Sequence, residues 1–195
     1  MPNPLSLLIH GAGGRMGRAL LRLAAADPQV RVAVAVTAGG DLAGPGAPAC
    51  VLAATRLDEA PEFDVAIDFS RPAGFDALLA LCVARGRPLV SGTTGLDASR
   101  FAALDRAAAA IPVLWAANFS AGVAVLEALV RQAAAALPDW DADIVETHHV
   151  HKLDAPCPTA RLACGRGGFR RCRRPSRAAP PRPAAPAPRG PRRRR

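Results

Sequence analysis

The sequence has no run of about 18 consecutive apolar residues, although half of its residues are hydrophobic. A helix that spans a membrane needs such a run, so we do not expect a membrane protein. The N-terminus also lacks the basic segment that begins a secretory signal, and glycines from Gly11 onward interrupt the apolar residues that follow. We therefore expect a cytoplasmic protein.

Acidic residues are absent after Asp154, and lysine occurs only once, at Lys152. Residues 155–195 contain 13 Arg and 9 Pro, so they carry +13, whereas residues 1–154 carry −4 and the total is +9. This composition cannot bury a core, and we expect residues 157–195 to be an Arg/Pro-rich disordered tail. Non-specific binding of nucleic acid by this tail is an alternative function.

The five cysteines include no C-x-x-C pair. Redox and metal-binding roles therefore have little support, and Cys50 and Cys82 are interpreted as small apolar residues of a core. We find no internal repeat.

Short apolar runs alternate with segments of helical periodicity through residues 5–147. We expect strands at 5–10, 30–36, 64–70, 89–91, 112–116 and 143–147, and helices at 15–26, 72–85, 96–110 and 122–137. This alternation predicts an α/β fold with a Rossmann-type doubly wound parallel sheet. We assign residues 1–119 to a dinucleotide-binding domain and residues 120–156 to the start of an incomplete α+β substrate domain.

A glycine-rich segment, Gly11-Ala12-Gly13-Gly14-Arg15-Met16-Gly17, follows the first strand and opens the first helix. Glycines at this position allow backbone N–H groups to approach a pyrophosphate, and the helix N-terminus favours its negative charge. A plain glycine-rich turn is the alternative. An acid that binds the ribose usually ends the second strand, but Thr37 and Ala38 stand there, so the choice between NADH and NADPH stays open.

Three polar clusters follow later strands: Asp68-Phe69-Ser70, Gly92-Thr93-Thr94 and Asn118-Phe119-Ser120. Because ligands of open α/β sheets bind beyond the carboxyl ends of the strands, the three clusters together predict a binding crevice. Ser70 taken alone is expected to cap the helix that follows it.

The segment His148-His149-Val150-His151-Lys152 places the single lysine beside three of the four histidines. Histidine and lysine can donate a proton to a C=N bond as hydride arrives, and they can neutralise substrate carboxylates. A metal site and a solvated polar loop are alternatives, although H-H-x-H is not a usual zinc spacing and we expect no metal.

In their order and sequence, these segments resemble the bacterial dihydrodipicolinate reductase (4-hydroxy-tetrahydrodipicolinate reductase) family. The similarity covers about residues 5–156 and includes Asp68-Phe-Ser-Arg-Pro72, Ala117-Asn-Phe-Ser-Ala-Gly-Val123 and His148-His-Val-His-Lys-Leu-Asp-Ala-Pro156. The resemblance implies a homotetramer that uses NADH or NADPH to reduce 4-hydroxy-tetrahydrodipicolinate in lysine and diaminopimelate synthesis.

The resemblance also implies roles for particular residues. It makes His148 and Lys152 catalytic proton donors, and it places His149 and Thr159 at the substrate. The cofactor residues that it implies, together with Thr37 at the end of the second strand, are Gly11, Ala12, Gly13, Gly14, Arg15, Met16, Gly92, Thr93, Thr94, Ala116, Ala117, Asn118 and Phe119.

The sequence departs from the family after Pro156, where the family continues Ser-Gly-Thr and this chain has Cys157-Pro158-Thr159. Pro158 has no N–H group to donate to a substrate carboxylate. The change of composition at Cys157 suggests a C-terminal truncation or a shifted reading frame. From the sequence alone we therefore expect a poor catalyst that still binds the dinucleotide, with a dinucleotide-binding protein that carries a nucleic-acid tail as the alternative.

Overall fold

The structure is a computed structural model that describes residues 3–44, 46–140, 142–143 and 172–173. The chain divides into two compact units, residues 1–126 and 127–195. The first unit contains strands β1 (Leu5–His10), β2 (Val30–Thr37), β3 (Val51–Ala53), β4 (Val65–Asp68), β5 (Leu89–Ser91) and β6 (Val113–Trp115). Its helices are α1 (Arg15–Ala26), the short 3-10 helix η1 (Ala54–Glu59), α2 (Pro72–Arg85) and α3 (Ala98–Ala108).

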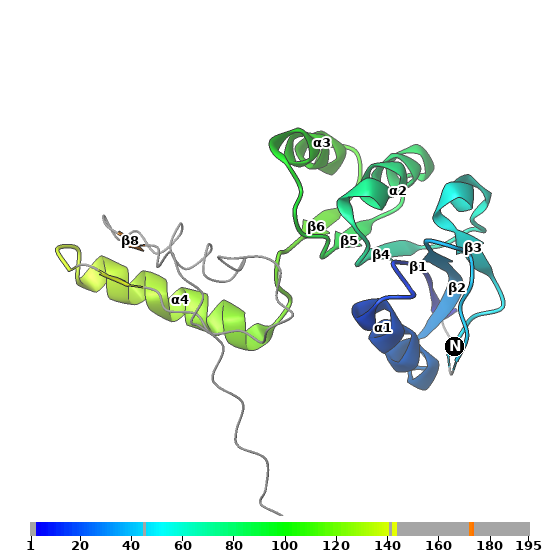
Figure 1. The fold of residues 1–195 in the computed structure, drawn as a ribbon, viewed down its shortest axis with the longest axis horizontal. Coiled ribbons are helices and arrows are strands. Elements are labelled where there is room, and N and C mark those ends of the chain that lie inside the picture. Colours follow the sequence, from blue (N-terminus) through cyan, green and yellow to red (C-terminus); the bar gives the residue numbers. More distant parts are fainter. Residues whose placement is uncertain (1–2, 45, 141, 144–171, 174–195) are drawn as a thin grey trace, which may run out of the picture. The chain divides into compact units, whose positions relative to one another are not determined.

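The six strands form one parallel sheet in the order β3-β2-β1-β4-β5-β6. The sheet grows in one direction from β1 to β3 and in the other from β4 to β6. Right-handed crossovers therefore place α1 on one face and α2 and α3 on the opposite face, as Figure 1 shows. This arrangement confirms the Rossmann-type doubly wound sheet that the sequence predicted.

Each face of the sheet has its own hydrophobic core. The core on the side of α2 and α3 includes Phe63, Phe75, Leu78 and Leu89, and the core beneath α1 includes Leu7, Ile9, Leu21 and Ala35. Cys82 is completely buried in the first of these cores, and burial raises the pKa of its thiol to about 12. Cys50 packs against the same core, so both cysteines occupy the apolar positions that the sequence indicated.

Helix ends agree with simple capping rules at two places. Gly86 adopts the left-handed conformation, with φ of 63°, directly after α2. Asp97 accepts a hydrogen bond from the backbone N–H of Arg100 at 3.0 Å and so caps α3. The expectation that Ser70 caps α2 was wrong, because Arg71 is the N-cap residue and no side chain caps that helix end.

The sequence did not predict β3 or η1, which lie between the loop after β2 and strand β4. A strand of three residues is too short to show the alternation that identifies longer strands. β3 nevertheless extends the sheet, because Ala35, Val36 and Thr37 pair with its three residues.

Helix α4 (Ala121–Ala136) begins in the first unit and ends in the second. The structure also describes two short paired strands of the second unit, β7 (Ala142–Asp143) and β8 (Cys172–Arg173). The expected strand at 143–147 and most of the expected tail at 157–195 fall outside the described residues. No helix in the described part of the chain is long and apolar enough to cross a membrane.

Candidate functional site

The glycine-rich segment forms a tight turn between β1 and α1. Gly11 has a φ of 77°, and a Cβ atom there would lie 2.5 Å from the carbonyl oxygen of Phe69. The N–H groups of Gly11 and Ala12 both donate to the carbonyl oxygen of Val36 at 3.0 Å. At Gly17 a Cβ atom would overlap the carbonyl of Gly11. Packing within the protein therefore explains why Gly11 and Gly17 lack side chains.

Gly13 and Gly14 are different, because both are exposed and little in the protein requires glycine there. A Cβ atom at Gly13 would meet only the Thr37 side chain at 3.7 Å, and one at Gly14 would lie 3.3 Å from the carbonyl oxygen of Gly11. Gly14 is the N-cap residue of α1, with a φ of −77° and no side-chain cap. The first turn of α1 thus presents its N–H groups on an open surface, as an anion-binding helix end must.

The side chain of Arg18 stabilises this turn through two hydrogen bonds. Its Nε donates to the carbonyl oxygen of Gly13 at 3.1 Å, and its Nη1 donates to the carbonyl oxygen of Ala43 at 3.2 Å. The glycine-rich turn is therefore tied to the loop that follows β2.

Thr37 ends β2 beside this turn and is 7% exposed. Its hydroxyl oxygen accepts a hydrogen bond from the N–H of Gly40 at 2.9 Å. The hydroxyl thus stabilises the loop after β2. Thr37 carries no charge at the position where Rossmann-type folds usually bind the ribose of the cofactor.

Asp68 ends β4 and is completely buried, and its carboxylate accepts four hydrogen bonds. Oδ1 accepts from Nδ1 of His10 and from the N–H of Ser70, both at 3.0 Å. Oδ2 accepts from the hydroxyl of Ser91 at 2.8 Å and from the hydroxyl of Thr93 at 2.7 Å. Because an ionised carboxylate only accepts, we assign the hydrogen of His10 to Nδ1.

Burial by itself raises the pKa of Asp68, but the hydrogen bonds from His10, Ser70 and Thr93 stabilise the charged form. Their combined effect holds the pKa below its ordinary value of 3.8. A carboxylate whose pKa is lowered by folding stabilises the protein above the unfolded value, and this contribution is lost as the pH falls through the folded value.

We expect Asp68→Asn to lower the free energy of unfolding at neutral pH by about 1–3 kcal/mol, because all four donors lose a charged acceptor and two of them would face the amide NH2 group. On acidification below about pH 4 the wild-type chain should lose this advantage, so the two unfolding curves should converge. Urea denaturation at several pH values measures the difference. A difference in stability that is constant with pH would show that the charge of Asp68 contributes nothing.

Thr93 was expected to line the nicotinamide side, but its side chain faces inward. It is 1% exposed, its hydroxyl donates to Asp68, and its carbonyl oxygen accepts from Nε1 of Trp115 at 2.9 Å. Gly92 lies against the ring of Phe69, and Thr94 is exposed. Thr94 and the loop backbone are therefore the groups that can meet a ligand directly.

The segment from Ala116 to Phe119 follows β6 at the same edge of the sheet. The N–H of Ala116 donates to the carbonyl oxygen of Ser91 at 3.1 Å. Phe119 packs edge-on against Phe69, with ring centroids 5.6 Å apart. The structure therefore brings the predicted segments after β1, β4, β5 and β6 to one rim, at the switch point between β1 and β4.

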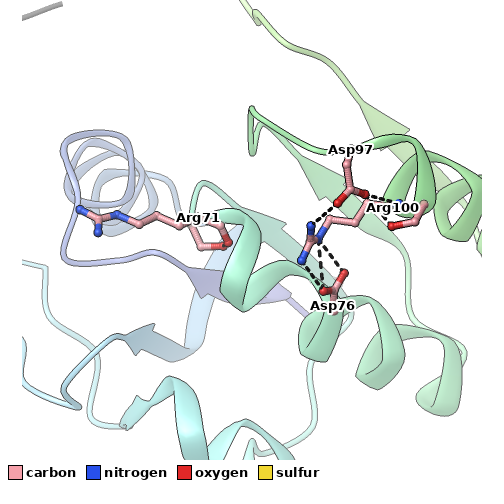
Figure 2. Close-up of polar contacts among 6 residues, drawn as sticks. Arg71, Asp76, Asp97 and Arg100 are labelled. Atoms are coloured by element: carbon pink, nitrogen blue, oxygen red, sulfur yellow. Dashed lines mark hydrogen bonds and ion pairs between the residues drawn. The ribbon is translucent and has the colours of Figure 1, made fainter. Parts of the chain in front are cut away.

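Two exposed arginines lie where helices begin at this edge of the sheet: Arg15 is the first residue of α1, and Arg71 is the N-cap residue of α2. Figure 2 shows Arg71 directed away from Arg100, which binds Asp76 and Asp97 at 2.8 Å each. Arg100 joins α2 to the start of α3, and the two carboxylates more than offset its single positive charge. Neither Arg15 nor Arg71 forms an ion pair with another described residue, so both remain available to an anionic ligand.

The residues expected to act in chemistry, His148, His149, Lys152 and Thr159, lie outside the described residues. The contacts of His10 and Ser91 with Asp68, and of Trp115 with Thr93, were not predicted from the sequence. Only the position of His10 directly before Gly11 gave a signal. Among the described residues, no three His, Cys, Asp or Glu side chains lie close enough together to hold a metal ion.

Comparison with known proteins gives consistent matches along the chain. The family model described as "Dihydrodipicolinate reductase, N-terminus" matches residues 5–119, and the one described as "Dihydrodipicolinate reductase, C-terminus" matches residues 122–166. The fold is similar to that of a dipicolinate-bound dihydrodipicolinate reductase from Paenisporosarcina sp. TG-14, with a TM-score of 0.65 and 21% identity. That likeness covers 90% of this chain and 71% of the other.

Two curated relatives carry the name 4-hydroxy-tetrahydrodipicolinate reductase. The protein of Xanthomonas campestris pv. campestris (strain B100) is 58% identical over 160 residues, which are 81% of this chain and 66% of that protein. The protein of Stenotrophomonas maltophilia (strain R551-3) is 58% identical over 171 residues, which are 85% of this chain and 71% of that protein. The chain thus spans about two thirds of the length of these relatives, and it belongs to the dihydrodipicolinate reductase family.

Proposed function

We propose that this chain takes part in the NADH- or NADPH-dependent reduction of 4-hydroxy-tetrahydrodipicolinate, a step of lysine and diaminopimelate synthesis. The observation that carries the proposal is the open glycine-rich turn at the switch point of the sheet, in a chain of this family. Such a turn suits a dinucleotide, and the curated relatives are named for this reduction.

The cofactor would bind along the rim described above. The pyrophosphate would lie at the turn of residues 11–16, where α1 begins without a side-chain cap and its first N–H groups are open. The N–H groups of Gly11, Ala12 and Gly14 are bound within the protein and would shape the turn instead. The nicotinamide half would lie at Gly92–Thr94 and Ala116–Phe119, which follow β5 and β6. When bound, the cofactor supplies the hydride.

The protein would supply the proton. We assign this role to His148 and Lys152, and contact with the substrate to His149 and Thr159, from their places in the family motif. The reduction removes the 4-hydroxyl group as water, so hydride would add to the carbon that carried it, in the conjugated imine that this loss leaves. A positioned general acid lowers the barrier because the ring nitrogen at the other end of the conjugated system gains electron density as hydride arrives.

We expect the affinities for NADH and NADPH to differ by less than about a hundredfold, or 2.7 kcal/mol. Thr37 is buried and bound to Gly40, so it neither repels a 2′-phosphate by charge nor binds it as an arginine would. Calorimetric titration with each cofactor measures the ratio. A larger preference for either cofactor would show that a residue other than Thr37 sets the choice.

Assembly and location are part of the same proposal. The family resemblance supports a homotetramer in the cytoplasm. The arginine-rich composition of residues 157–195 supports a second candidate, non-specific nucleic-acid binding, which salt-dependent binding lost on deletion of these residues would establish.

An assay of cofactor oxidation tests the activity. The 195-residue chain is compared with a chimera in which residues 1–156 are followed by the corresponding remainder of the Xanthomonas relative. We expect the chimera to oxidise NADH only when enzymatically generated 4-hydroxy-tetrahydrodipicolinate is present. A folded chimera that binds NADH but shows no substrate-dependent oxidation would refute the proposed reaction.

A further inference from the structure

The four hydrogen bonds to Asp68 come from four different places in the fold. His10 ends β1, Ser70 precedes α2, Ser91 ends β5, and Thr93 lies in the loop after β5. The carboxylate connects the strand ends on both sides of the switch point.

Thr93 is fixed through each of its polar groups. Its hydroxyl donates to Asp68 at 2.7 Å, its N–H donates to the hydroxyl oxygen of Ser91 at 3.2 Å, and its carbonyl accepts from Trp115 at 2.9 Å. The Trp115 ring is itself held edge-on by Phe101, with centroids 4.9 Å apart. The loop from Gly92 to Thr94 is therefore anchored at its middle residue, and Thr94 alone of its two threonines is exposed.

The same carboxylate is connected to the glycine-rich turn. His10, which donates to Asp68, directly precedes Gly11, and the backbone of Phe69 and Ser70 closes against Gly11. Asp68 thus accepts hydrogen bonds from His10, which leads into the glycine-rich turn, and from Thr93, which lies in the loop after β5.

We propose that Asp68 and Thr93 are positioning residues that hold the loop Gly92–Thr94 in register with the turn Gly11–Gly14, so that one dinucleotide can occupy both at once. The inference rests on the proposed function, since it concerns the same site. Neither side chain would touch the cofactor, because both are buried and their polar atoms are bound within the protein.

The proposal distinguishes a whole dinucleotide from its half. ADP-ribose can occupy the glycine-rich turn but has no nicotinamide to place at Gly92–Thr94. Removing the hydrogen bond that anchors the loop at Thr93 should therefore lower the affinity for NADH and leave the affinity for ADP-ribose almost unchanged. A residue that served only the stability of the domain would affect both ligands equally or neither of them.

The test uses the full chain and three variants, with calorimetric titration of NADH and of ADP-ribose. Thr93→Val keeps the shape but removes the hydroxyl, Thr93→Ser keeps the hydroxyl, and Thr55→Val is an exposed control in η1. We expect Thr93→Val to lower the affinity for NADH about tenfold, as the loss of a hydrogen bond to a charged group does. The affinity for ADP-ribose should fall less than about twofold. Thr93→Ser and Thr55→Val should bind both ligands like the wild type.

If Thr93→Val does not fold, Trp115→Phe provides the second test, because it removes the donor to the Thr93 carbonyl and retains an aromatic ring. The same selective loss of NADH affinity is expected. Equal losses for both ligands, or no loss in a folded variant, would overturn the inference while the wild type still binds NADH. A wild-type chain that binds neither ligand would overturn the proposed function and this inference together.

Discussion

Replacement of Gly14 by aspartate is expected to abolish the binding of NADH while the domain stays folded. Gly14 is exposed at the N-cap of α1 and has a φ of −77°, which any residue can adopt. Aspartate is a favourable N-cap residue, so its carboxylate would accept from the helix N–H groups that the pyrophosphate needs. It would also repel the phosphates. We expect the dissociation constant to rise at least about a hundredfold.

Two matched variants show whether charge or bulk causes this loss. Gly14→Asn caps the helix without a charge, so it should lower the affinity for NADH less than Gly14→Asp does. Gly17→Ala should instead unfold or strongly destabilise the domain, since its Cβ atom would overlap the backbone of Gly11 and Ala12. Calorimetry and thermal melting separate the two effects. NADH affinity unchanged in folded Gly14→Asp would reject the assignment of this turn to the pyrophosphate.

The second large effect concerns the proton donors. In the chimera of residues 1–156 with the remainder of the Xanthomonas relative, we expect Lys152→Ala and His148→Ala each to reduce turnover by about 10²–10⁴-fold. The loss should appear in kcat, because these groups act as the hydride arrives rather than in binding the cofactor. Steady-state kinetics measures it.

Cofactor binding is the control for both of these variants. NADH affinity should equal that of the unsubstituted chimera, since the proposed cofactor residues end at Phe119. Turnover within about threefold of the unsubstituted chimera for either variant would exclude that residue as the general acid.

The sequence was sufficient to predict the sheet and most of its helices. Strand β1, helix α1, helix α2 and strand β5 have the expected bounds, because short apolar runs, helical periodicity, Pro72 and Gly86 mark them. The three-residue strand β3 could not be found, since its pairing with β2 rather than its own pattern makes it a strand.

The interior of the site was harder to predict. Asp68, Ser70 and Thr93 all lie in segments that the sequence assigned to a rim, but their side-chain directions depend on contacts between distant residues. His10 and Asp68 are 58 positions apart, and Thr93 and Asp68 are 25 apart. No local rule predicts that Thr93 turns inward while Thr94 stays exposed. The expected cap at Ser70 failed because Arg71 is the N-cap residue and the hydroxyl of Ser70 donates to the carbonyl oxygen of Arg71.

Titration of the wild-type chain with NADH, followed by calorimetry, tests most directly the claim that the turn between β1 and α1 binds a nicotinamide dinucleotide. We expect saturable binding of one NADH per chain, with competition by NADPH and by ADP-ribose. A folded chain that takes up no NADH and no NADPH, while its melting temperature is the same with and without them, would contradict it.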